Sequence, residues 1–191
     1  MTIDYASDWA STDHDPELTP EQSEKLAEVT QELVLFGLEN NVEPGDAVGL
    51  SQSYFDALHE LAARHYNSRR FDSAATLYQR LLRLKPLQLV YYKGLGACCM
   101  GLERYDAAVK VYHSARVIDA LDAEVVYYLG LAYYFQKDFP AAFDLMRFAR
   151  LQAEDDPQPS SKIAEFATQM LERIKSLVPP EQAALIDFRP S

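Results

Sequence analysis

The histidines and cysteines are the side chains best suited to metal binding or nucleophilic chemistry, but their spacing builds no such site. Cys98 and Cys99 are neighbours, so on a helix their side chains point apart. We interpret them as small buried hydrophobic residues, which fits a reducing compartment. His59 and His65 stand six apart and project from different faces of one helix. His14, between two aspartates, is interpreted as solvated polar sequence rather than as a metal ligand.

Gly94 and Gly96 stand two apart, as in a dinucleotide-binding loop, but the rest of that fingerprint is absent and the stretch reads as helix. The sequence contains no HExxH pattern, no paired CxxC motif and no glycine-rich phosphate loop. The pattern places no carboxylates in a buried pair suited to acid–base catalysis. We therefore predict that the chain is not an enzyme and that it has no cofactor and no metal site.

Composition excludes further classes of function. The chain has 191 residues, a net charge of −11 and 48% hydrophobic residues. A strongly acidic chain is unsuited to nucleic acid, whose phosphates need a basic surface. The first twenty residues carry no basic region and no apolar run, so we expect no signal peptide. No stretch approaches the ~20 apolar residues of a membrane span. We expect a cytoplasmic protein without stable membrane insertion.

The sequence repeats at a spacing of 34 residues. Six columns match in character: Leu61, Leu95 and Leu129; Ala62, Gly96 and Gly130; Phe71, Tyr105 and Phe139; Ala74, Ala108 and Ala142; Tyr78, Tyr112 and Met146; Leu81, Ala115 and Ala149. This period and this order of large and small residues resemble the tetratricopeptide repeat, a helix-turn-helix unit.

Small residues recur where two helices must approach closely. The predicted repeat-packing residues are Ala74, Gly96, Ala108, Gly130 and Ala142. A glycine costs a helix about 1 kcal/mol relative to alanine, so close packing must offset that cost at Gly96. Gly94 has no such role in the repeat, and we expect its missing side chain to leave space for something else.

We predict an all-α fold with three tetratricopeptide repeats in a right-handed superhelix and flanking N- and C-terminal helices. The expected divisions are a disordered acidic N-terminus (1–18), an N-terminal helical region (19–54), repeats at 55–88, 89–122 and 123–156, a C-terminal capping helix (157–178) and a flexible tail (179–191). First helices are expected near 52–67, 87–101 and 122–136, and second helices near 71–84, 105–118 and 139–153.

The inner surface of such a superhelix is built from the first helices. The predicted groove residues are His59, Ala63, Tyr66, Lys93, Gly94, Ala97, Met100, Tyr127, Tyr128, Leu131 and Tyr134. Together they form an apolar, tyrosine-rich cradle suited to an extended peptide. The alternative is that some of these tyrosines pack against the C-terminal helix. A clamp for a terminal carboxylate is not expected, because Glu124 stands at one of its positions.

The chain resembles the tetratricopeptide class of type III secretion chaperones, which hold the hydrophobic translocator proteins of Gram-negative bacteria. The resemblance rests on GLGAC at 94–98, YDAA at 105–108 and HYNSRRFDSA at 65–74, and it covers about residues 25–175. By position, Tyr66 matches an aromatic groove residue of that family. His59 and Ala63 stand where its members often carry aromatic residues.

The resemblance implies a bacterial cytoplasmic chaperone that binds an extended segment of one or two translocators in its concave groove. It also implies a homodimer formed through residues 20–50. The alternative is a general tetratricopeptide scaffold that binds another protein in a bacterial assembly. The sequence names neither the client nor the host organism.

Overall fold

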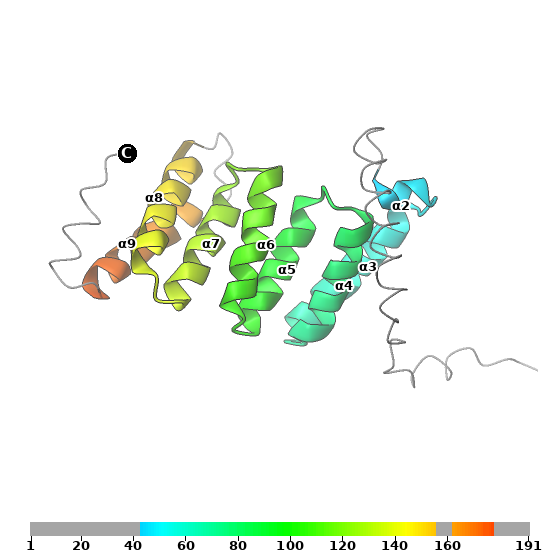
Figure 1. The fold of residues 1–191 in the computed structure, drawn as a ribbon, viewed down its shortest axis with the longest axis horizontal. Coiled ribbons are helices and arrows are strands. Elements are labelled where there is room, and N and C mark those ends of the chain that lie inside the picture. Colours follow the sequence, from blue (N-terminus) through cyan, green and yellow to red (C-terminus); the bar gives the residue numbers. More distant parts are fainter. Residues whose placement is uncertain (1–42, 156–161, 178–191) are drawn as a thin grey trace, which may run out of the picture.

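The structure is a computed structural model that describes residues 43–155 and 162–177 (Figure 1). Within those ranges the elements are α2 (Pro44–Ala47), α3 (Gln52–Asn67), α4 (Phe71–Leu84), α5 (Leu89–Gly101), α6 (Tyr105–Ile118), α7 (Ala123–Phe135), α8 (Phe139–Asp155) and α9 (Ile163–Leu177). These residues form no β-strand, and the predicted all-α class is confirmed. The predictions for residues 1–42 and 178–191 lie outside the described residues.

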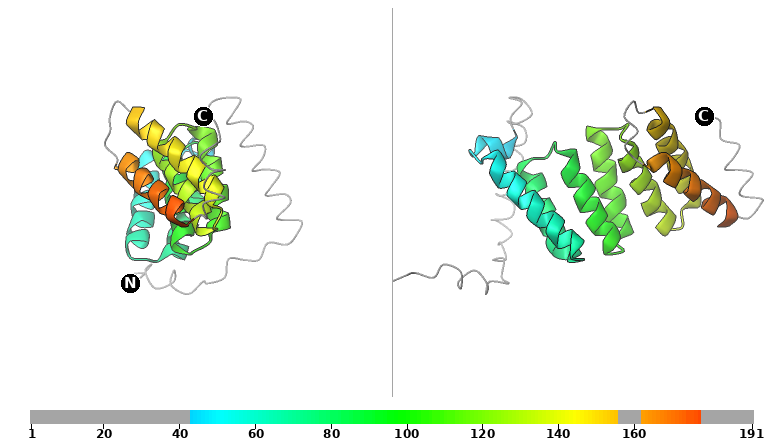
Figure 2. Two further views of the ribbon diagram at one scale, coloured as in Figure 1. Left: turned by 90° about the vertical axis from the view of Figure 1, so that its left-hand side faces the viewer. Right: turned by 180° about the vertical axis from the view of Figure 1, so that it is seen from behind.

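Three helical hairpins stand in a row, with α3 and α9 at opposite ends (Figures 1 and 2). Helix α3 pairs with α4, α5 with α6 and α7 with α8, while α4 also packs against α5 and α6 against α7. Helix α9 closes the row by packing on α8 and, over a smaller area, on α7. The buried residues form one large hydrophobic cluster that runs from α3 to α7 and two smaller clusters among α7, α8 and α9. Each hairpin thus buries its apolar residues against its neighbour, as in a repeat array.

The same turn connects the two helices of each hairpin. Arg69, Glu103 and Lys137 adopt positive φ angles of 58°, 57° and 66°, at a spacing equal to the repeat. Each turn is closed by a backbone hydrogen bond of 2.9–3.0 Å between residues five apart, such as that from the amide of Arg70 to the carbonyl of His65. This geometry ends the first helix and starts the second, so the three hairpins have a common shape.

The small residues of the repeat lie at close helix contacts. Ala74, Ala108 and Ala142 are fully buried, and Gly96 and Gly130 are buried as well. A methyl group at Gly96 would collide with the ring of Tyr112, and one at Gly130 would lie 3.1 Å from the Cβ of Leu145. The cost of Gly96 to its helix is offset because the Tyr112 ring packs directly on the backbone.

The structure corrects the interpretation of Gly94. The space above this glycine is filled by the protein itself, because the ring of Tyr78 from α4 lies where a Cβ would stand. Gly94 thus has a packing role between hairpins, and Gly96 has one within its own hairpin.

Each end of the row has its own packing contacts. Near the N-terminal end, the ammonium group of Lys85 lies 3.1 Å from Glu43 and 2.5 Å from Asp46, and it sits 5.1 Å from the ring centre of Phe55. At the other end, α9 buries Ile163, Ala167, Leu171 and Ile174. The helical periodicity places Phe166 on that buried face, but Phe166 is 41% exposed.

Candidate functional site: an aromatic cavity between the hairpins

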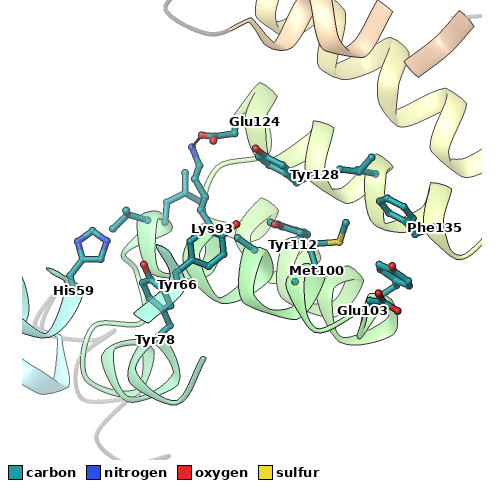
Figure 3. Close-up of a pocket in the computed structure, with 17 residues that line it drawn as sticks. His59, Tyr66, Tyr78, Lys93, Met100, Glu103, Tyr112, Glu124, Tyr128 and Phe135 are labelled. Atoms are coloured by element: carbon teal, nitrogen blue, oxygen red, sulfur yellow. Dashed lines mark hydrogen bonds and ion pairs between the residues drawn. The ribbon is translucent and has the colours of Figure 1, made fainter. Parts of the chain in front are cut away.

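A cavity of about 1050 Å³ opens between the first helices of the hairpins (Figure 3). Its walls consist of His59, Tyr66, Tyr78, Leu89, Val90, Lys93, Gly94, Ala97, Met100, Gly101, Glu103, Tyr105, Tyr112, Glu124, Tyr128, Leu131 and Phe135. Figure 3 shows Tyr112 and Tyr128 between His59 at one end and Phe135 and Glu103 at the other. The wall is mainly aromatic and aliphatic, with few charged groups.

The structure brings eight of the eleven predicted groove residues onto this wall. They are His59, Tyr66, Lys93, Gly94, Ala97, Met100, Tyr128 and Leu131. Ala63 does not line the cavity. Tyr127 and Tyr134 are also absent from the wall.

Tyr127 and Tyr134 pack against the C-terminal helix, which is the alternative considered for the tyrosine group. The ring of Tyr127 lies 6.4 Å from that of Phe166. The Nε of Arg173 donates a hydrogen bond of 2.9 Å to the Tyr134 hydroxyl, and its guanidinium lies 5.9 Å from the centre of the same ring. Helix α9 thus packs on the face of α7 that carries these two residues, and Tyr128 is the one of the three predicted α7 tyrosines that lines the cavity.

Sequence reasoning missed the contribution of the second helices. Two tyrosines of second helices, Tyr78 on α4 and Tyr112 on α6, line the cavity. Sixteen positions after each of them stands a cavity residue of the following helix, which is Gly94 on α5 for Tyr78 and Tyr128 on α7 for Tyr112. Because Gly94 has no side chain, the Tyr78 ring packs directly on the backbone of α5. Tyr128 instead stacks on Tyr112, with ring centres 6.1 Å apart. The repeat pattern assigns both tyrosines to packing alone, although the sixteen-residue spacing was available as a signal.

Tyr112 is the most unusual polar residue of the wall. Its side chain is fully buried, and its hydroxyl has no hydrogen-bond partner among the described residues. Burial raises the pKa of Tyr112, and the nearby phenols of Tyr128 and Tyr66 raise that pKa further. A buried hydroxyl without a partner carries a desolvation cost that a bound group could remove.

The positive charge of Lys93, the lysine of the cavity wall, is balanced by carboxylates of the protein itself. The Nζ of Lys93 lies 2.7 Å from the carboxylate of Glu124 (Figure 3). It also lies 2.8 Å from the carboxylate of Asp122. Burial would lower the pKa of Lys93, but the hydrogen bonds that its ammonium group donates to these two carboxylates outweigh that effect, and the pKa is raised. Lys93 is therefore charged and already paired, so it is poorly placed to hold a ligand carboxylate.

His59 lies between two tyrosines at the first-hairpin end of the cavity. Its ring centre is 5.9 Å from that of Tyr78 and 5.6 Å from that of Tyr91, both edge-on. The imidazole thus packs among aromatic rings, and its nitrogen atoms can in addition form hydrogen bonds.

The described residues also give information on metal-binding clusters, reactive thiols and membrane spans. No group of three or more histidine, cysteine, aspartate or glutamate side chains among them could hold a metal ion. Cys98 is buried, and burial raises the pKa of its thiol to about 12, which leaves it unreactive. None of the helices within residues 43–155 and 162–177 combines the length and apolarity of a membrane span.

Comparison with known proteins places this cavity in context. No family model matches the chain. Low calcium response locus protein H of Yersinia pseudotuberculosis serotype I (strain IP32953) is 23% identical over 150 residues, which is 76% of this chain and 88% of that protein. PcrH of Pseudomonas aeruginosa, solved in complex with the chaperone binding region of PopD, is 26% identical with a TM-score of 0.64, over 68% of this chain and 96% of that one.

This chain is similar to type III secretion translocator chaperones. The Yersinia enterocolitica translocator chaperone SycD has the same fold, with a TM-score of 0.66 and 21% identity over 69% of this chain and 97% of that one. The resemblance stated from the sequence is confirmed, and so is the helical repeat fold that it implied.

Proposed function

We propose that this chain is a bacterial cytoplasmic chaperone that binds an extended segment of a hydrophobic type III secretion translocator in its aromatic cavity. Binding would cover apolar surface of the client, which would otherwise aggregate, and would keep it ready for secretion. The observation that carries the proposal is the tyrosine-rich cavity, in a chain similar to PcrH, which was solved with chaperone binding regions of PopD and of PopB.

The wall of the cavity suits a polypeptide better than a small polar metabolite. Most of its side chains are aromatic or aliphatic, so apolar side chains of a client gain burial there. Tyrosine hydroxyls at intervals can bond the backbone of an extended chain, which has no hydrogen bonds of its own. PcrH was solved with the chaperone binding region of PopD and, separately, with that of PopB. We therefore propose one or two translocators as clients of this chain.

A homodimer is part of the same proposal. SycD of Yersinia enterocolitica was also solved as an alternative dimer. Most of the segment expected to form such a dimer, residues 20–50, lies outside the described residues.

Co-expression with the hydrophobic translocator encoded beside it in its own host tests the proposal. We expect a stoichiometric complex in the soluble fraction, whereas the translocator alone aggregates. Tyr66→Ala and Tyr128→Ala should each weaken the complex by about tenfold or more, since aromatic anchors dominate such interfaces. Affinity is measured by isothermal titration calorimetry with a peptide mapped from the client.

Tyr133→Ala is the matched control, because Tyr133 lies on α7 like Tyr128 but does not line the cavity. It should leave client affinity unchanged, and melting temperatures should show that all three variants fold. If the folded Tyr66 and Tyr128 variants bind as well as the wild type, the cavity is not the client site. A bound segment that proves helical would favour the general scaffold instead.

A further inference from the structure

The charged groups of the cavity differ in whether they already have partners. Lys93 and Glu124 satisfy each other, with Asp122 as a third member. Glu103, at the α5–α6 turn, is exposed, and within residues 43–155 and 162–177 its carboxylate contacts no cation. The cation next to it in sequence, Arg104, pairs with Asp72 at 3.4 Å instead. Among the charged side chains of the wall, Glu103 therefore has no ion-pair partner within the described residues, and it lies at one end of the cavity.

The surroundings of Glu103 make it a receptor for a side chain that is both apolar and positively charged. Met100, Tyr105 and Phe135 line the same cavity, and the last two stack with ring centres 5.0 Å apart and planes within 10°. A lysine or arginine has a long apolar stem that can lie on such rings while its charged end reaches a carboxylate. Aromatic faces also attract cations directly.

Tyr112 gives an independent sign that a polar ligand group enters the cavity. Its hydroxyl is buried and has no partner among the described residues, in the middle of the wall between His59 and Glu103 (Figure 3). A backbone carbonyl or amide of an extended segment is the group that would satisfy it, since a phenol can donate or accept. The segment would then run past Tyr112 towards Glu103.

We propose that the segment bound in the cavity carries a lysine or arginine that pairs with Glu103, beside apolar residues whose backbone bonds the Tyr112 hydroxyl. This proposal rests on the proposed function and specifies the chemistry of its client. The charge also sets direction, because a basic residue at one end of the segment fixes which way the segment lies in the cavity.

A peptide library tests the pairing even while the client is unidentified. Random peptides displayed on phage are selected on the full chain, and Tyr128→Ala identifies those that need the cavity. We expect these cavity-dependent peptides to be enriched in lysine or arginine close to an apolar run. Selection on Glu103→Lys should replace that enrichment with aspartate or glutamate.

A double-mutant cycle then measures the pairing. For one selected peptide, replacing the basic residue by methionine should weaken binding to the wild type by about two- to fivefold, the range of an exposed ion pair. The same peptide change should have no effect on Glu103→Gln. Glu172→Gln is the matched control, because Glu172 is an exposed carboxylate on α9 outside the cavity, and it should behave as the wild type.

Tyr112→Phe removes only the buried hydroxyl. We expect it to weaken all cavity-dependent peptides by about three- to tenfold, whatever their sequence, the effect of one hydrogen bond. The melting temperature should not fall, because the hydroxyl has no partner among the described residues of the free protein. A lower melting temperature, or unchanged peptide affinity, would contradict the role given to Tyr112.

The outcomes separate this inference from the proposed function. Cavity-dependent peptides without basic enrichment, or a cycle with no coupling to Glu103, overturn the inference and leave the chaperone function standing. If no selected peptide depends on Tyr128, both are wrong.

Discussion

Three residues other than glycine adopt the left-handed backbone conformation at the hairpin turns. Arg69, Glu103 and Lys137 have φ angles between 57° and 66°, a region that costs a non-glycine residue about 1 kcal/mol or more. The repeat demands this conformation, because the turn must reverse the chain within a few residues. One of the three, Glu103, also lines the cavity.

Arg69→Gly should therefore raise stability. Arg69 is exposed and forms no ion pair with the described residues, so two backbone effects decide the result. Relief of the left-handed conformation gains about 1–2 kcal/mol and the chain entropy of glycine costs about 0.5–1 kcal/mol, which leaves a net gain of about 0.5–1 kcal/mol. Urea denaturation measures the change. Ser68→Gly is the control, since Ser68 has a φ of −85° and gains nothing from glycine; it should lose about 0.5–1 kcal/mol. Equal effects of the two changes would contradict the strain argument.

At the scale of the helices, small residues determine how closely the hairpins stack. Ala108 is fully buried on α6 and recurs at the same place in each repeat. Space at such a contact is filled to the density of a protein interior, so extra volume forces the helices apart. The cavity depends on this stacking because its wall combines residues of successive hairpins.

Ala108→Leu should overpack the middle hairpin and lower the free energy of unfolding by about 1–3 kcal/mol. Val117→Leu provides the comparison on the same helix, because Val117 is 87% exposed and should change stability by less than about 0.5 kcal/mol. Thermal denaturation of both variants gives the answer. An unchanged melting temperature for Ala108→Leu would show that the repeat register is wrong.

Across the whole molecule, many proton-binding groups are held in their protonated forms. Burial raises the pKa values of several tyrosines, most strongly that of Tyr112, above the ordinary value of 10.0. Burial opposes the charged forms of Lys85 and Lys93, but their paired carboxylates outweigh it and raise their pKa values above 10.5. The folded state thus holds these protons more tightly than the unfolded chain does.

We therefore expect the free energy of unfolding to fall as pH rises above about 10. The stabilisation from these groups is complete below the unfolded pKa values and is lost as pH rises through the folded ones, with the same sign for tyrosine and lysine. Urea denaturation between pH 8 and 11 measures the decline. Tyr112→Phe should make it shallower, and stability that stays constant up to pH 11 would contradict the prediction.

The sequence by itself determined the repeat, the helix order and most of the inward-facing positions. A 34-residue period of small and large residues reflects contacts made within a hairpin and with its neighbour, so it can be read without coordinates. The first and last residues of α3, α4 and α6 match the expected bounds. The first-helix positions led to Tyr66 and Tyr128 on the cavity wall.

Only the tertiary structure decided which tyrosines remain free to face a ligand. Tyr127, Tyr128 and Tyr134 are alike in sequence, but α9 covers the first and last of them. Likewise, the sequence predicts open space beside Gly94, whereas in the structure the Tyr78 ring of the previous hairpin fills that space. Periodicity records which way a side chain points from its own helix, whereas its final neighbours depend on how elements distant in sequence pack.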